Sequence, residues 1–171
     1  MTGLLLLLLA AEHASAAPYT GPSPDLSFWS SILTNADEQP LAEHRALRVI
    51  RFPEALVSAT VVTVRPGSKG AILRVCQLRD RRSPGCVAES WSVSEGEYAE
   101  LAVLARAGLW SKAQVAPTGR PELLDGVSWF IEGYREGQRW VIVRHEPTDP
   151  DVVAFLNEVM LLARLPDLKA Q

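Results

Sequence analysis

Hydrophobic and polar positions follow two different periods along the chain. Between residues 46 and 93, apolar side chains alternate with polar ones in four runs that are rich in β-branched residues. Turn-forming sequences separate these runs, among them Pro66-Gly67-Ser68-Lys69 and Ser83-Pro84-Gly85. The pattern predicts an antiparallel meander of four strands over residues 46–52, 58–65, 70–80 and 86–93.

Helical spacing follows the meander and returns near the end of the chain. Ser94 and Glu97 have the pattern of a capping box, and the apolar residues after them keep helical spacing up to Gly108, which we expect to end the helix. Asp149-Pro150-Asp151 predicts the start of another helix, because an acidic first turn and an early proline both favour a helix N-terminus. Its broad apolar face contains Val152, Phe155, Leu156, Val159, Met160 and Ala163.

A hairpin is predicted between these helices, over residues 128–135 and 138–144, with Glu136-Gly137 as its two-residue turn. Pairing Arg135 with Gln138 fixes its register. Trp129 then lies opposite Arg144, Ile131 opposite Ile142, and Gly133 opposite Trp140. Because side chains alternate between the two faces of a strand, Glu132, Tyr134 and Arg139 share the other face.

The order of elements predicts an α+β fold. An antiparallel sheet, made of the four-strand meander and the C-terminal hairpin, carries two long helices on one face. The other face is expected to be partly open or covered by the N-terminal segment, where a short helix is predicted after Ser23-Pro24. We expect a signal peptide over residues 1–16, a flexible N-terminus with the short helix over 17–43, one domain over 44–166, and a tail over 167–171.

The first sixteen residues have the layout of a secretory signal peptide. Residues 4–9 are six consecutive leucines, and Ala14-Ser15-Ala16 has the small-x-small pattern of a cleavage site. The apolar run is much shorter than the roughly 20 residues that span a bilayer. We therefore predict cleavage after Ala16, export to the periplasm or the medium, and no transmembrane segment in the mature chain.

Composition fits a single globular domain and argues against a nucleic-acid partner. The chain is 47% hydrophobic and 22% charged, and its formal net charge of −3 gives no electrostatic reason to bind a polyanion. The sequence leaves the oligomeric state open.

Cys76 and Cys86 are the only two cysteines. An even count in an exported chain favours a disulfide, and these two lie on predicted neighbouring strands around a short turn. The alternative is a pair of unpaired, half-buried thiols.

Residues 44–165 resemble a group of small exported bacterial proteins to which no activity is assigned. The similarity rests on Ala46-Leu47-Arg48-Val49, on Gly108-Leu109-Trp110, and on a C-terminal pattern of L-D-G-x-x-W-x-x-E-G followed by R-x-x-P. The last pattern reads here Leu124-Asp125-Gly126, Trp129, Glu132-Gly133, Gly137, Arg144 and Pro147. The resemblance implies export and an α+β fold, and it transfers no chemistry.

Three residues are weak candidates for acid-base chemistry: Asp125, Glu132 and His145. A structural interpretation competes with each of them, since Asp125-Gly126 has the pattern of a turn and Glu132 lies diagonal to Arg139. His145-Glu146, Asp149 and Asp151 are rich in oxygen and nitrogen donors, but their spacing matches no closed metal motif. We predict no catalytic residues, no metal and no cofactor.

Aromatic residues suggest a binding face instead. The candidate binding residues are Tyr134, Trp140, Trp129 and Arg144, and a cation–π contact is predicted between the last two. We expect a non-enzymatic binding module of the bacterial envelope, of which an inhibitor or immunity protein is one version, with another envelope or secreted protein as partner. The alternatives are a hydrolase acting on an envelope polymer and an envelope-structural protein.

Overall fold

A computed structural model of the chain describes residues 27–38, 41, 45–53, 58–80, 82–110, 126–135 and 138–165. The predicted signal peptide, Asp125, the Glu136-Gly137 turn and the C-terminal tail lie outside these residues. The described chain is α+β, with a six-stranded antiparallel sheet and three α-helices, which confirms the predicted fold class.

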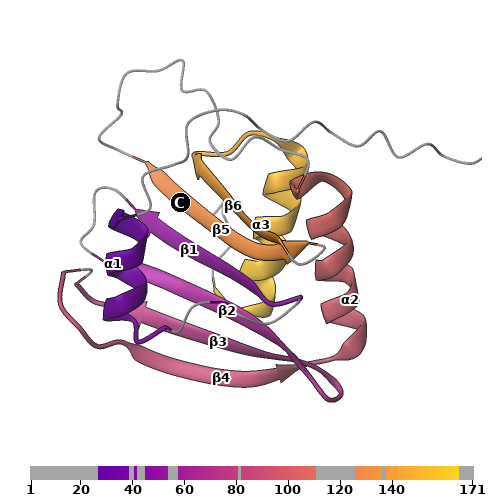
Figure 1. Ribbon diagram of the computed structural model, residues 1–171, viewed down its shortest axis with the longest axis horizontal. Helices are drawn as coiled ribbons and strands as arrows, with labels where there is room; N and C mark the ends of the chain where they lie inside the picture. The colour runs from indigo at the N-terminus through magenta and orange to yellow at the C-terminus, as the bar shows by residue number, and fades with distance from the viewer. Residues whose placement is uncertain are drawn as a thin grey trace, which may run out of the picture.

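The sheet has the strand order β4-β3-β2-β1-β5-β6 (Figure 1). Four of its strands follow each other in the chain: β1 (Leu47–Pro53), β2 (Ala59–Gly67), β3 (Gly70–Leu78) and β4 (Val87–Val93). The hairpin of β5 (Val127–Arg135) and β6 (Gln138–His145) joins the free side of β1. The hairpin has the predicted register, with Arg135 opposite Gln138, Trp129 opposite Arg144, and Gly133 opposite Trp140.

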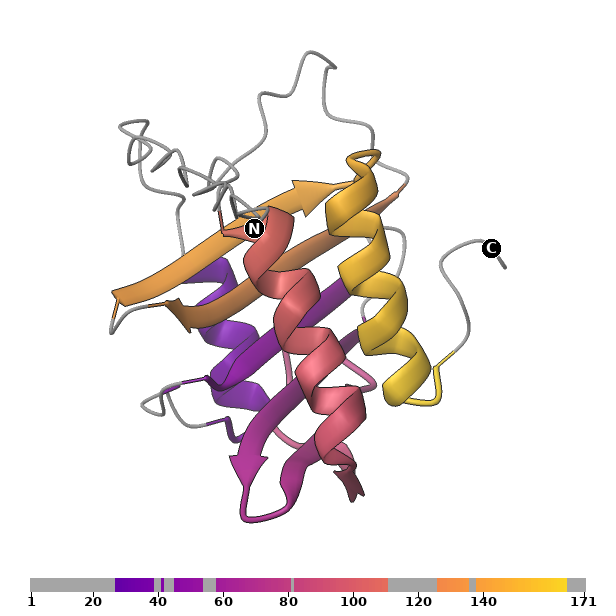
Figure 2. The ribbon, with the colours of Figure 1, turned by 90° about the vertical axis from the view of Figure 1, so that its right-hand side faces the viewer.

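Helices lie on both faces of the sheet. Figure 2 shows α2 (Glu95–Leu104) and α3 (Pro150–Leu162) in front of the sheet, with α1 (Ser27–Asn35) behind it. We call the side under α2 and α3 the helix face, and the other side the α1 face. Each face has its own apolar cluster, so the sheet is the middle of three layers.

The ends of α2 and α3 follow from the sequence with one exception. Ser94 caps α2 in a capping box with Glu97, and Asp149 caps α3 by accepting a hydrogen bond from the backbone N–H of Asp151 at 3.1 Å. The prediction that Gly108 ends the second helix is wrong. The chain continues through a π-helical turn, Ala105–Leu109, which places Leu109 and Trp110 in the core of the helix face.

The helix α1 is held by tertiary packing. A helix of nine residues is too short to be stable alone in water. Trp29 and Ile32 are buried against the α1 face, where the Trp29 ring stacks on Phe130 with the centroids 5.4 Å apart. No helix within the described ranges is long and apolar enough to cross a membrane.

Candidate functional site on the α1 face of the sheet

One row of side chains across the α1 face is largely polar. It runs in register from β6 to β4 through Val141, Glu132, Arg48, Thr63, Arg74 and Ser90, and we call it the polar row. The adjacent row, on the side of α1, is entirely apolar and contains Val143, Phe130, Ile50, Val61, Cys76 and Ala88. The α1 face therefore has an apolar half under α1 and a polar half beside it.

Arg48 is at the centre of the polar row, and its side chain is 0% exposed. Its guanidinium donates to Oε2 of Glu132 at 3.0 Å, to Oε2 of Glu38 at 3.0 Å, and to Oγ1 of Thr63 at 3.3 Å. A buried charge is stable only when such partners replace its hydration. Arg48 therefore joins three segments of the chain: β5, β2 and the residues just after α1.

Glu132 is the strongest of the acid-base candidates within the described chain, and it is fully engaged. Its side chain is 2% exposed, one carboxylate oxygen accepts from Arg48, and the other accepts from Nε of Arg139 at 2.6 Å. The predicted pairing of Glu132 with Arg139 is thus confirmed. Both oxygens of this carboxylate are therefore held by arginines from neighbouring strands of the sheet.

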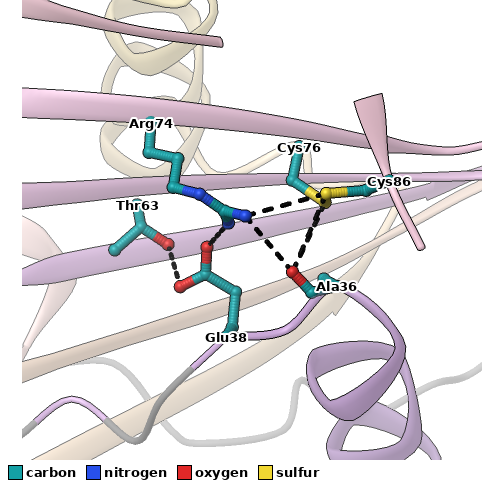
Figure 3. Close-up of a disulfide and its surroundings, with 6 residues drawn as sticks. All are labelled: Ala36, Glu38, Thr63, Arg74, Cys76 and Cys86. Atoms are coloured by element: carbon teal, nitrogen blue, oxygen red, sulfur yellow. Dashed lines mark hydrogen bonds and ion pairs between the residues drawn. A yellow bond between two sulfur atoms is a disulfide. The ribbon is translucent and has the colours of Figure 1, made fainter. Parts of the chain in front are cut away.

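Glu38 is the member of the network that the sequence analysis missed. Its side chain is 3% exposed and it pairs with Arg48. It also pairs with Arg74, and Thr63 Oγ1 donates to its Oε2 at 3.0 Å (Figure 3). Glu38 follows α1 directly and is distant in sequence from its partners. The only sequence signal was a pair of adjacent carboxylates, Asp37 and Glu38, just after a helix, where such side chains are normally solvated.

The predicted disulfide between Cys76 and Cys86 is confirmed, with a Cα–Cα distance of 5.5 Å. Cys76 lies opposite Ala88, so Cys86 is its diagonal neighbour just before β4. The carbonyl oxygen of Ala36 lies 3.9 and 3.7 Å from the sulfurs of Cys76 and Cys86, as Figure 3 shows. These are packing contacts, since disulfide sulfurs carry no proton to donate.

Arg74 connects the disulfide to the ionic network. Besides Glu38, its guanidinium reaches the Ala36 carbonyl oxygen at 3.4 Å and the Cys86 sulfur at 3.7 Å (Figure 3). The backbone N–H of Gly85 also donates to the carbonyl of Asn35 at 2.9 Å. The C-terminal end of α1 is therefore fixed to the sheet by the disulfide loop, by Arg74 and by Arg48.

A second row lies beyond the polar row, on the side away from α1. It contains the paired residues Tyr134 and Arg139 at the β6 side and Arg65, Ile72 and Ser92 at the β4 side, and we call it the outer row. Ile72 is 52% exposed and the Arg139 side chain 44% exposed, whereas Tyr134 and Arg65 are half-buried. The outer row is the most accessible part of the α1 face that the described residues include.

The predicted binding residues divide between the two faces. Tyr134 belongs to the outer row, whereas Trp140 packs against the core of the helix face and Trp129 is buried within that core. The Arg51 guanidinium lies 6.0 Å from the Trp129 ring centroid. Arg144 lies opposite Trp129 as predicted, and the stacking of Arg144 on the Trp129 ring stays a prediction. Burial lowers the pKa of Arg144, and the negative charge of Asp149 partly opposes this shift.

His145 and Glu132 do not form a pair. Nδ1 of His145 lies 3.2 Å from Oγ of Ser128, its neighbour across the hairpin. Ser128 and Glu132 are four residues apart on β5, which separates them by roughly 13 Å along the strand. Within the described chain, no group of three or more His, Cys, Asp or Glu side chains could hold a metal ion.

Comparisons with known proteins add no function to this geometry. A scan against protein-family models found no match, and a search of curated protein sequences found no similar protein. The proposals below therefore rest on the sequence and on the described contacts alone.

Proposed function

We propose that this protein is an exported, non-enzymatic binding module of the bacterial envelope, and that it binds another envelope or secreted protein through the outer row. The observation that carries the proposal is the state of Glu132. This carboxylate is 2% exposed and both of its oxygens are held by arginines, while its neighbours in the outer row, Tyr134 and Arg139, are half-buried and 44% exposed. That arrangement supports a contact surface more than an acid-base site.

The charges of the polar and outer rows indicate what kind of surface the partner presents to them. The polar and outer rows, together with Glu38, contain four arginines (Arg48, Arg65, Arg74 and Arg139) and two glutamates, a local net charge of +2 in a chain whose formal net charge is −3. Tyrosine and arginine are enriched at the centres of protein interfaces, and an exposed isoleucine adds apolar area. A partner with an acidic patch and an apolar contact matches this surface. Inhibition of an enzyme or neutralisation of a toxin is one version of such binding.

Export is part of the same proposal. Residues 1–16 have the layout of a signal peptide, and a structural disulfide is typical of proteins that fold in an oxidising compartment. The resemblance to small exported bacterial proteins agrees with this. We expect the mature protein in the periplasm or the medium.

Site-specific photo-crosslinking in the producing cells tests the binding surface. A photo-reactive amino acid at Tyr134 or Ile72 should give one discrete adduct with an acidic envelope protein, and adding Arg139→Glu should abolish that adduct. The same group at Val103, which is exposed on α2 at the opposite side of the molecule, is the matched control. Adducts of equal yield from Val103 and Tyr134 would contradict a site on the outer row.

The hydrolase alternative has its own test. A purified protein that releases soluble fragments from an envelope polymer, and that loses this activity in a folded Glu132→Gln or His145→Ala variant, would overturn the binding proposal. An Asp125→Asn variant belongs in the same assay, since Asp125 lies outside the described residues.

A further inference from the structure

The two edge strands of the sheet differ in accessibility. At the β6 edge, Val141, Ile142 and Arg144 are buried. At the β4 edge, residues 87–90 and 92 are exposed, and Val87 is an apolar side chain with 55% of its surface exposed. In Figure 1, β4 forms the lower border of the sheet. An exposed edge strand presents backbone N–H and C=O groups that can pair with another extended segment.

We propose that β4 pairs with β4 of a second copy of this chain, in antiparallel orientation about a two-fold axis through Ser90. Ser90 is the middle residue of Val87–Val93, so this register is the one that pairs the whole strand with itself. A two-fold contact of this kind uses the same surface on both copies, and each favourable contact therefore occurs twice.

Charge complementarity supports this register. It places Glu89 opposite Trp91 of the second copy, and both side chains point to the helix face. The Arg164 guanidinium lies over the Trp91 ring at 4.8 Å from its centroid, and the Trp91 indole N–H donates to the carbonyl of Leu162 at 3.1 Å. Each Glu89 carboxylate thus comes beside an arginine that is already held in place on the second copy.

Neighbouring registers are less favourable. An axis through Glu89 would put two like charges directly opposite each other, which destabilises a strand pair. With the axis at Ser90, the α1 face is lined by small side chains, because Ser90 lies opposite itself and Ala88 opposite Ser92 of the second copy. On the helix face, the exposed Val87 comes to lie opposite Val93. Small side chains allow two sheets to join without a steric clash.

The axis is perpendicular to the sheet, so it has a consequence for the proposed binding surface. Both copies present their α1 face on the same side of the joined sheet. Two outer rows would then face a partner together, and a partner with two acidic patches would bind with higher avidity than one. The dimer itself does not depend on the binding proposal: Ser92 belongs to both surfaces, but Glu89, Ser90 and Arg164 lie apart from Tyr134 and Arg139.

Charge reversal provides the first test. Sedimentation equilibrium of the purified protein over a concentration series should show a monomer–dimer equilibrium. Glu89→Arg and Arg164→Glu should each raise the dimer Kd by about tenfold, since two symmetry-related contacts become repulsive. The double variant should recover wild-type affinity, because the swapped charges attract again. Lys69→Glu, which changes the charge as Arg164→Glu does but at the exposed β2–β3 turn, is the control and should leave the Kd unchanged.

Cysteine cross-linking provides a second test that does not depend on the affinity of the charge variants. Ser90→Cys should form an intermolecular disulfide under mild oxidation, because a residue on the axis lies opposite itself at about 5 Å between Cα atoms. Ser92→Cys, which lies opposite Ala88, should not. A protein that stays monomeric up to its solubility limit would overturn the proposal, as would equal cross-linking of both variants or a dimer that neither charge reversal weakens.

Discussion

Trp110 lies against Gly133 on the helix face, so closely that a Cβ atom on Gly133 would be 2.7 Å from Cη2 of the indole and 2.8 Å from Cδ2 of Leu47. On the opposite face, the adjacent residue Glu132 pairs with Arg48, which follows Leu47 in β1. The Leu47-Arg48, Trp110 and Glu132-Gly133 parts of the resemblance pattern therefore meet at one place in the structure. The pattern has a structural explanation there: glycine makes room for the indole, and glutamate neutralises the buried arginine.

Gly133→Ala should lower the free energy of unfolding by about 1–3 kcal/mol, because the added methyl group must displace a packed ring and a leucine. Urea unfolding followed by tryptophan fluorescence measures the loss. Gly67→Ala in β2 is the control, since a Cβ atom there has no neighbour closer than 3.7 Å. Equal stability of the Gly133→Ala protein and the wild type would mean that Trp110 does not occupy this position.

Arg48→Met should destabilise the protein by about 3 kcal/mol, because it leaves two buried carboxylates with fewer positive partners. Glu38 and Glu132 each keep one arginine, which places the effect at the low end of the range for breaking a buried pair. Chemical denaturation gives the value. Arg139→Met should lower the free energy of unfolding by less than Arg48→Met, since the Arg139 side chain is 44% exposed. A larger loss from Arg139→Met than from Arg48→Met would contradict the central role of Arg48.

Replacing both cysteines, Cys76→Ala with Cys86→Ala, should cost about 2–3 kcal/mol, the range expected for a bridge that closes a short loop. The amide protons of α1 should also exchange faster with deuterium, since its C-terminal end contacts the disulfide through Ala36 and Arg74. Exchange measured by mass spectrometry follows α1 directly. If the variant and the wild type exchange equally in α1 while the variant exchanges faster in α3, the bridge does not hold α1.

The Glu158 carboxylate should make the free energy of unfolding depend on pH. Burial raises the pKa of Glu158 above its ordinary value, and the nearby charges of Glu100 and Glu97 raise it further. The folded state therefore binds a proton more tightly than the unfolded state, so this carboxylate destabilises the fold at neutral pH and the penalty disappears as the pH falls through its folded pKa. Glu158→Gln should stabilise the protein at neutral pH, and the difference should vanish below about pH 4.

Urea unfolding of both proteins across this pH range measures the effect. A Glu100→Gln variant should show part of the same gain at neutral pH, since it removes one of the two repelling charges. If the stability gained by Glu158→Gln instead increased toward acid pH, the pKa of Glu158 would not be raised in the folded protein.

Intact mass spectrometry of the secreted protein tests processing. The mature chain should begin at Ala17, and reduction should add the mass of two hydrogen atoms, one for each thiol that the bridge releases. An N-terminus at Met1 in the secreted fraction would contradict the predicted signal peptide.

Short-range features of the fold followed from the sequence because they depend on residues that are close in the chain. The helix caps and turns are local hydrogen-bonding patterns, and the hairpin register follows from a two-residue turn. Cys76 and Cys86 could be paired for the same reason, since a short turn places the two segments that carry them side by side. The alternating pattern of the strands also fixed which hairpin residues share a face, including the separation of Tyr134 from Trp140.

Tertiary structure alone decided how these pieces combine. The hairpin could have joined either side of the meander, and it joins β1, which brings Glu132 to Arg48 across 84 residues of sequence. The position of α1 likewise determines that Glu38 is a buried partner of Arg48, while Ile72 and Arg139 in the outer row stay exposed. Such choices depend on burying the apolar area of distant segments together and on neutralising every charge that this burial encloses, and neither quantity can be read from the residues next to each other in the chain.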